Sequence, residues 1–208
     1  MISLQILKMT PAFSRSYRMT TAFCAFLLFF STMSGYVLWQ ENPALAEQVV
    51  EQVVSSKFSP LVVKMQAANW LGRIRIILVN NLMATVLLVF TGGILPVLPV
   101  VLGIIPNGTM IGLMAGYYEH QQLAKSAFFL GILPHGIFEI PAILLSATVG
   151  MIWGARNWRN LMFERKRLTF FTQTKESLSF FPLIITLLVL ASIVEVLVTP
   201  VLIKANLP

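Results

Sequence analysis

Long stretches of this chain carry no charged residue, and that feature limits the fold more than any other. About twenty consecutive apolar residues cross the hydrocarbon core of a bilayer, roughly 30 Å thick, as one α-helix. A helix also satisfies its backbone hydrogen bonds within one segment, as the bilayer requires. The runs therefore predict an all-α fold, a polytopic transmembrane helical bundle of about five spans that forms a single membrane domain over residues 1–208.

The composition agrees with a surface that faces lipid. Hydrophobic residues make up 57% of the chain and charged residues 11%, whereas a soluble domain carries about 25% charged residues. The net charge of +7 comes from Lys and Arg that stand between the apolar runs, where the positive-inside rule expects them. This pattern predicts the lipid bilayer as the partner, and no nucleic acid.

Glycine and proline residues divide the runs into separate helices. The spans are expected at residues 20–39, 76–90, 94–118, 126–153 and 178–203. Gly92 and Gly93 are expected to end the second span. Broken or short helices are predicted around Pro96–Gly116 and at Pro134, since such backbone is tolerated at membrane depth when it is packed in protein or lines a cavity. A helix that starts at Pro134 would leave Ser126–Leu133 as a separate short arm.

The region 41–75 is amphipathic and does not read as a span. Valine pairs and Glu-Gln pairs alternate with helical period between residues 47 and 54. Pro60 interrupts the pattern, and Trp70–Arg75 leads into the next span. We expect an extracytoplasmic amphipathic, interfacial helical region that lies along the bilayer surface or binds a partner.

Two basic segments predict the orientation. The loop 154–177 is rich in Arg and Lys, and so is the N-terminal segment before the first span. Both are therefore expected on the cytoplasmic side. The four crossings predicted between them agree with this, because an even number of crossings returns the chain to the same side. The chain is predicted to be a multi-pass protein of the bacterial cytoplasmic membrane, with its N-terminus in the cytoplasm and its C-terminus outside.

Polar side chains occur within three of the apolar runs. They are Asn80 and Asn81, His135 and Glu139, and Glu195. A charge at bilayer depth costs about 2.5–3.5 kcal/mol on insertion scales, so these groups are expected to face the protein interior. His135 and Glu139 are four residues apart and share one helix face. We predict that all five side chains meet in one buried cluster.

The cluster has two interpretations. It is either a polar latch that fixes helix packing or a working site. Because every Lys and Arg lies at or beyond a predicted span end, the two carboxylates need a shared proton, a protonated His135 or a metal ion. His135, Glu139 and Glu195 would make an acceptable three-ligand zinc site. No nucleophile signature or phosphate loop occurs, and the sequence identifies no catalytic residue.

Other marked residues have simpler interpretations. Asn107-Gly108 predicts a turn or a helix cap, and the four tryptophans are expected at the membrane interfaces. Gly112 and Gly116 form a small-residue face. That face could serve a homodimer or packing within one chain.

The polar motifs resemble those of the stage II sporulation protein M family. The most specific is the Pro-His-Gly-x-x-Glu-x-Pro-Ala run at 134–142. Asn80-Asn81, Asn107-Gly108 and Glu195 followed by Val198-Thr199-Pro200 accompany it. In this order the motifs cover residues 76–203, and the length and five-span organisation also look like the family.

The resemblance implies a membrane component of endospore formation. The sporulation member works with two peptidoglycan-processing partners during engulfment, and relatives are also encoded beside circular bacteriocins. The function that this favours is a scaffold or anchor that recruits or positions cell-wall-processing proteins, more simply a non-enzyme than an enzyme. The alternative is an intramembrane metal-dependent hydrolase, or a component of small-solute or peptide export, that uses His135, Glu139 and Glu195.

The orientation can be tested with reporter fusions. Alkaline phosphatase fused after Lys204 is expected to be active, because the C-terminus is predicted to lie outside. The same enzyme fused at Glu164 is expected to be inactive. Activity at Glu164 would contradict the predicted topology.

Overall fold

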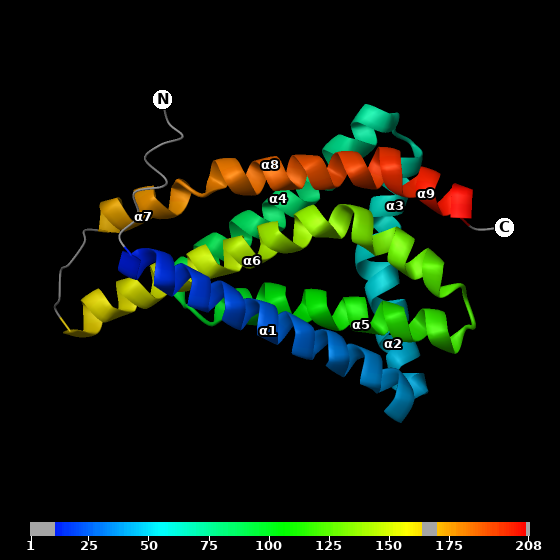
Figure 1. Cartoon of the computed structure of the whole chain (residues 1–208), viewed down its shortest axis with the longest axis horizontal. Helices are drawn as coiled ribbons and strands as arrows, with labels where there is room; N and C mark the ends of the chain where they lie inside the picture. Colours follow the sequence, from blue (N-terminus) through cyan, green and yellow to red (C-terminus); the bar gives the residue numbers. More distant parts are fainter. Residues whose placement is uncertain (1–10, 164–169, 207–208) are drawn as a thin grey trace.

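The computed structural model describes residues 11–163 and 170–206 of the chain, and this part is almost entirely helical (Figure 1). No strand occurs in it. The α-helices are α1 Pro11–Glu41, α2 Pro43–Val53, α3 Ser59–Gln66, α4 Trp70–Ile94, α5 Ile105–His120, α6 Lys125–Phe163, α7 Phe170–Leu178, α8 Phe181–Ile193 and α9 Thr199–Asn206. Three π-helical segments join them, η1 Val54–Phe58, η2 Val100–Ile104 and η3 Val194–Val198.

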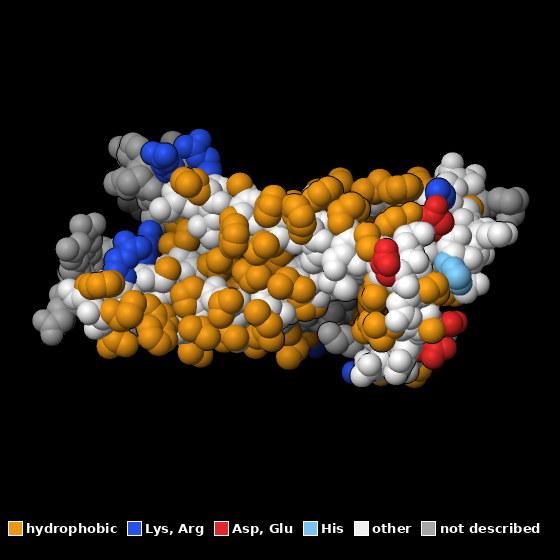
Figure 2. All heavy atoms as spheres, turned by 90° about the horizontal axis from the view of Figure 1, so that it is seen from below, with side chains coloured by type: hydrophobic (Ala, Val, Ile, Leu, Met, Phe, Trp, Pro, Cys, Tyr) orange, Lys and Arg blue, Asp and Glu red, His pale blue; other side chains and the backbone are white. Residues whose placement is uncertain are grey.

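Five helices within the described ranges are long and apolar enough to cross a membrane. They cover Arg15–Glu41, Trp70–Ile94, Val100–His120, Lys125–Phe163 and Phe171–Asn206. The prediction of an all-α polytopic bundle of about five spans is confirmed, and the chain is a multi-pass membrane protein. Figure 2 shows one face of it, on which hydrophobic side chains cover most of the length between the two ends.

The region between the first two spans is helical, as expected, but shorter than expected. Here α2, η1 and α3, which we call the arm (residues 43–66), run across the bundle at a steep angle to the spans (Figure 1). Pro60 does not interrupt the helical chain, because it lies in the first turn of α3, where a missing N–H is harmless. Trp70–Arg75, assigned to this region from the sequence, instead forms the start of α4. Asn69 caps α4, since its Oδ1 accepts a hydrogen bond from Gly72 N at 2.8 Å.

The expected end of the second span at Gly92 and Gly93 is wrong. Both glycines stay helical within α4. A Cβ on Gly92 would lie 2.5 Å from the Gly150 carbonyl carbon, and one on Gly93 would lie 2.6 Å from the Trp153 ring. These glycines therefore serve close packing of α4 on α6 and do not break the helix.

The third span is less broken than expected. The turn around Pro96 precedes it and η2 opens it, but α5 then continues through Pro106 and its glycines without interruption. Gly112 packs against Thr32 and Gly116 against Trp39, both on α1. The small-residue face is thus used for packing within the chain and is not free to form a dimer. The homodimer stays a prediction, and this face does not support it.

Pro134 does not separate two helices. Lys125–Phe163 forms one helix, α6, with Pro134 and Pro141 inside it. The predicted short arm at Ser126–Leu133 is instead the first part of this helix, which changes direction along its length (Figure 1). Proline inside a helix removes a backbone hydrogen bond and produces such a bend.

The two ends of the bundle differ. At one end α6 meets α7 through an ion pair from Arg156 to Glu176, 2.8 Å between Nη1 and Oε2. Residues 164–169 of the predicted basic loop lie outside the described residues. We call this the Arg156 end, and the other, where the arm lies, the arm end.

Two of the four tryptophans are buried within the bundle. Trp39 is 3% exposed and Trp153 is 6% exposed. The Trp39 indole donates a hydrogen bond to the Leu113 carbonyl at 2.7 Å. Both therefore serve helix packing, whereas Trp70 and Trp158 are exposed.

A glycine substitution tests the close packing of α1 on α5. A Cβ on Gly112 would overlap the Thr32 carbonyl oxygen, whereas a Cβ on Gly131 meets no atom within 4 Å. Gly112→Ala is therefore expected to lower the free energy of unfolding by about 1–3 kcal/mol through overpacking. Gly131→Ala is the matched control and is expected to leave stability unchanged or raised. Thermal unfolding in detergent measures both, and equal unfolding temperatures would contradict this packing.

Candidate functional site

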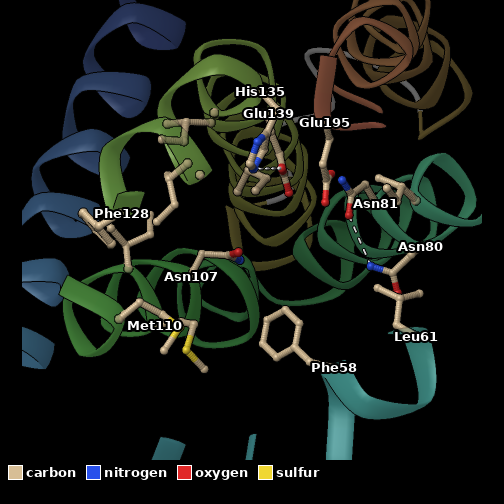
Figure 3. A pocket seen from close by; sticks show the side chains of 18 of the residues that line it. Phe58, Leu61, Asn80, Asn81, Asn107, Met110, Phe128, His135, Glu139 and Glu195 are labelled. Carbon is tan, nitrogen blue, oxygen red and sulfur yellow. Dashed lines mark hydrogen bonds and ion pairs between the residues drawn. The ribbon is translucent and has the colours of Figure 1, made fainter. Parts of the chain in front are cut away.

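His135, Glu139 and Glu195 come together in the interior of the bundle (Figure 3). The first two lie one turn apart on α6, and Glu195 comes from η3. Each offers one ligand atom, and these atoms all lie within 4.8 Å of one another. The His135 Nε2 lies 3.9 Å from the Glu139 Oε2, and both side chains are largely buried. We call these three residues the cluster.

π-Helical segments border the cluster. Glu195 lies in η3, η2 ends three residues before Asn107, and η1 ends at Phe58. An i→i+5 hydrogen-bond pattern shifts the register of the side chains that follow it, and π segments are frequent at functional sites. The three segments thus set the directions of the side chains that come together around the cluster from three parts of the chain.

Three asparagines lie beside the cluster. Asn80 donates from Nδ2 to the Asn81 Oδ1 at 3.2 Å, and Asn81 lies beside Glu195 (Figure 3). Asn80 itself is exposed, so the prediction that all five side chains are buried together is wrong for Asn80. Asn107 is neither the turn nor the cap that its sequence suggests. It lies inside α5, where its Nδ2 donates to the Gly103 carbonyl at 2.8 Å.

The cluster and the asparagines line one pocket of about 400 Å³. Several of its other residues carried no sequence signal of a site, because their apolar side chains look like ordinary span residues. Phe58 from the arm, Met110 on α5 and Phe128 on α6 are examples (Figure 3). Phe58 lies 22 residues before Asn80 in the sequence, so only the folded chain reveals that the arm borders the pocket.

The charges in this pocket are not balanced by protein groups. Two carboxylates face it, and none of its described lining residues is Lys or Arg. One imidazole nitrogen also lacks a protein partner, since His135 Nδ1 is buried without a hydrogen bond in the described part of the chain. Like charges at this separation repel strongly at low dielectric. The arrangement therefore suits a bound cation or a shared proton.

The donor set fits a zinc ion. One imidazole nitrogen and two carboxylate oxygens are zinc ligands, and a catalytic site commonly has three protein ligands and one open position. At metal–ligand distances of about 2.0–2.2 Å, tetrahedral ligand atoms stand roughly 3.4 Å apart. The observed limit of 4.8 Å lets rotations of these side chains close the site.

Other polar residues at the arm end do not join the cluster. Glu119 accepts a hydrogen bond from the Tyr36 hydroxyl and pairs with Lys125, 3.3 Å from Oε1 to Nζ. The His120 ring lies against Trp39, with ring centroids 5.1 Å apart. His120, the other of the two histidines of the chain, thus lies outside the pocket.

Known proteins were compared with the chain as a whole. The family model described as "Stage II sporulation protein M" matches residues 23–200, which include the cluster and all three asparagines. An uncharacterized protein of Methanocaldococcus jannaschii is 32% identical over 124 residues, which is 60% of this chain and 69% of that protein. A second uncharacterized protein of the same organism is 39% identical over 85 residues, 39% of each chain. No solved structure matches.

Proposed function

The chain belongs to the stage II sporulation protein M family, and we propose that it binds a divalent metal ion, with zinc the best fit, in the pocket within its bundle. The observation that carries this proposal is the meeting of His135, Glu139 and Glu195, whose ligand atoms lie within 4.8 Å of one another. The absence of Lys and Arg from the described lining leaves a cation as the natural counter-charge.

Hydrolysis is the chemistry that such a site supports. A zinc ion with three protein ligands makes a bound water acidic enough to ionise near neutral pH and polarises a substrate carbonyl. The open position would face the pocket. The amides of Asn80, Asn81 and Asn107 would then orient the polar part of a substrate, since amides donate and accept hydrogen bonds without adding charge.

A polar latch accounts for the cluster less well. A latch stabilises packing when its buried polar groups pair with one another. Here the His135 Nε2 and the Glu139 Oε2 are 3.9 Å apart, which is beyond hydrogen-bond distance, and the His135 Nδ1 has no partner in the described structure. The groups also border a cavity and not a close-packed interior.

Metal content tests the proposal. Wild-type protein purified without added chelator is expected to carry about one zinc ion per chain, as is typical of a three-ligand protein site. His135→Ala and Glu195→Gln are each expected to lower the content at least tenfold, because each removes one of three ligands. Inductively coupled plasma mass spectrometry of the purified proteins gives the ratio.

His120→Ala is the matched control for this experiment. It removes the only other histidine of the chain, which lies against Trp39 and outside the pocket, and it is expected to keep the zinc. Wild-type protein that carries no metal after incubation with zinc, or equal zinc in wild type and His135→Ala, would overturn the metal site.

We also propose a role as an anchor at the bacterial cytoplasmic membrane, with the N-terminus inside and the arm and C-terminus outside. In this role the chain recruits or positions cell-wall-processing proteins during endospore engulfment. The exposed apolar side chains of the arm favour it. They are Leu45, Val54, Phe58, Val62 and Val63. A helix that lies across the spans can rest in the membrane interface or bind a partner.

The arm can be tested apart from the metal. Scrambling residues 44–56 preserves composition but destroys the apolar face, and co-purification of the peptidoglycan-processing partners is expected to fall at least fivefold. Phe171→Ser at the Arg156 end, where Phe171 is 78% exposed, is the control, and co-purification is expected to persist. Unchanged co-purification in the arm variant would count against this binding face.

A further inference from the structure

The pocket beside the cluster has two walls of different chemistry (Figure 3). One carries the cluster and the amides of Asn80 and Asn81 on α4. The other is formed by the arm, α5 and the first part of α6, and apart from Asn107 on α5 it is mostly apolar. Its main side chains are Phe58, Leu61, Met110, Ile111, Met114 and Phe128. A ligand that satisfies both walls has a polar group at one end and a hydrocarbon part at the other.

The pocket volume limits the size of such a ligand. About 400 Å³ lies within the range of small-molecule sites, roughly 300–1,000 Å³. A single turn of an α-helix, about 5.4 Å long and 10–12 Å wide with its side chains, fills roughly 400–600 Å³. A helical peptide would therefore enter with no more than one turn, whereas a flexible hydrocarbon chain can place part of its length in the pocket and leave the rest in the membrane.

The lining chemistry limits the ligand further. No described lining residue is Lys or Arg, so a polyanion such as a nucleotide would find no basic side chain. Met110 and Met114 lie one turn apart on α5, and methionine adapts its flexible, polarizable side chain to irregular apolar surfaces. These features favour an uncharged polar head and a chain of variable shape.

Unfilled space adjoins the cluster on α6. Of the twelve glycines of the chain, all of them in the described part, only Gly131 has no atom within 4 Å of an added Cβ. Gly131 lines the pocket and lies four residues before His135, so the two share one helix face. The free space therefore leads along α6 directly to the cluster.

We propose that this pocket binds a single-chain lipid amphiphile taken from the surrounding membrane. Its polar junction lies against the cluster and the asparagine amides, and its hydrocarbon chain lies along Met110, Met114 and Phe58. The inference deepens the metal-dependent function proposed above and rests on it for the chemistry alone, because the apolar wall and the amides bind without a metal.

The chemistry at the junction is hydrolysis of an ester. The water oxygen bonds to the carbonyl carbon, the bond from that carbon to the alcohol oxygen breaks, and the proton passes to the leaving alcohol. Nothing is oxidised or reduced. The two carboxylates and the imidazole of the cluster would be metal ligands, so the proton passes from the attacking water to the alcohol oxygen without a further protein group.

A photoreactive monoacylglycerol with a diazirine in its chain tests the binding. The full-length protein is reconstituted in vesicles of dioleoylphosphatidylcholine, irradiated and digested, and the adducts are located by mass spectrometry. Adducts are expected on α5 at Met110 and Met114, and unlabelled monooleoylglycerol is expected to compete them away. Adducts on lipid-facing residues, such as Ile137 at 61% exposed, report non-specific labelling and are expected to resist competition.

Two variants that fill the pocket test whether the adducts come from ligand bound inside it. Gly131→Leu fills the free space from α6, and Met110→Trp fills it from α5, where the adducts are then read at Met114. Each is expected to reduce the competed adducts at least tenfold. Ile137→Phe, on the lipid-facing side of α6, is the control and is expected to keep them. Adducts confined to lipid-facing positions, or competed adducts that survive both filling variants, would overturn the proposal.

The same experiment separates this inference from the metal site. Wild-type protein stripped of zinc with a chelator is expected to keep the competed adducts, which would leave the amphiphile standing if the metal proposal failed. Zinc-loaded protein without competed adducts would retain the metal and remove the amphiphile. Competition by an apolar transmembrane peptide, without competition by monooleoylglycerol, would replace the amphiphile with a peptide.

Discussion

The structure depends on one electrostatic constraint, which is the placement of two carboxylates and an imidazole inside a bundle of apolar spans. Each such charge is costly at bilayer depth, and the pocket that holds Glu139 and Glu195 has no Lys or Arg in its described lining. On the face seen in Figure 2, hydrophobic side chains cover most of the length between the two ends. The proposed metal ion would neutralise the carboxylates, bind the imidazole and leave an open position toward the cavity, so a single cation would account for all three features.

The helices around this site are closely packed on some sides and leave open space on another. Gly112 and Gly116 bring α5 against α1, and Gly92 and Gly150 bring α4 against α6, at distances where a Cβ would collide with the neighbouring helix. Gly131 differs, because open space surrounds it. Close packing on two sides thus fixes the backbones that carry the asparagines and the histidine, while the gap between α5 and the first part of α6 remains as the pocket. The arm borders this gap with Phe58.

Much of the fold and part of the site were predictable from the sequence. Apolar runs predict spans because crossing a bilayer as a helix requires mainly a sufficient length of apolar residues. The spacing of His135 and Glu139 predicts one shared face because both lie on the same helix. Helix ends were less predictable. Gly92, Gly93 and Pro134 stay within helices, since tertiary packing outweighs local propensity. The direction of the Glu195 side chain depends on a π segment, and the position of Phe58 depends on how the arm packs. Neither feature leaves a periodic signal in the sequence.

X-ray absorption at the zinc edge tests the central claim most directly, because it reports the ligands themselves. The measurement is made on the zinc-loaded His120→Ala variant, in which His135 is the only histidine left. The account predicts a first shell of nitrogen and oxygen at about 2.0–2.2 Å, together with the outer-shell scattering of one imidazole. An all-oxygen shell without imidazole scattering would contradict it, since the metal would then be bound away from His135.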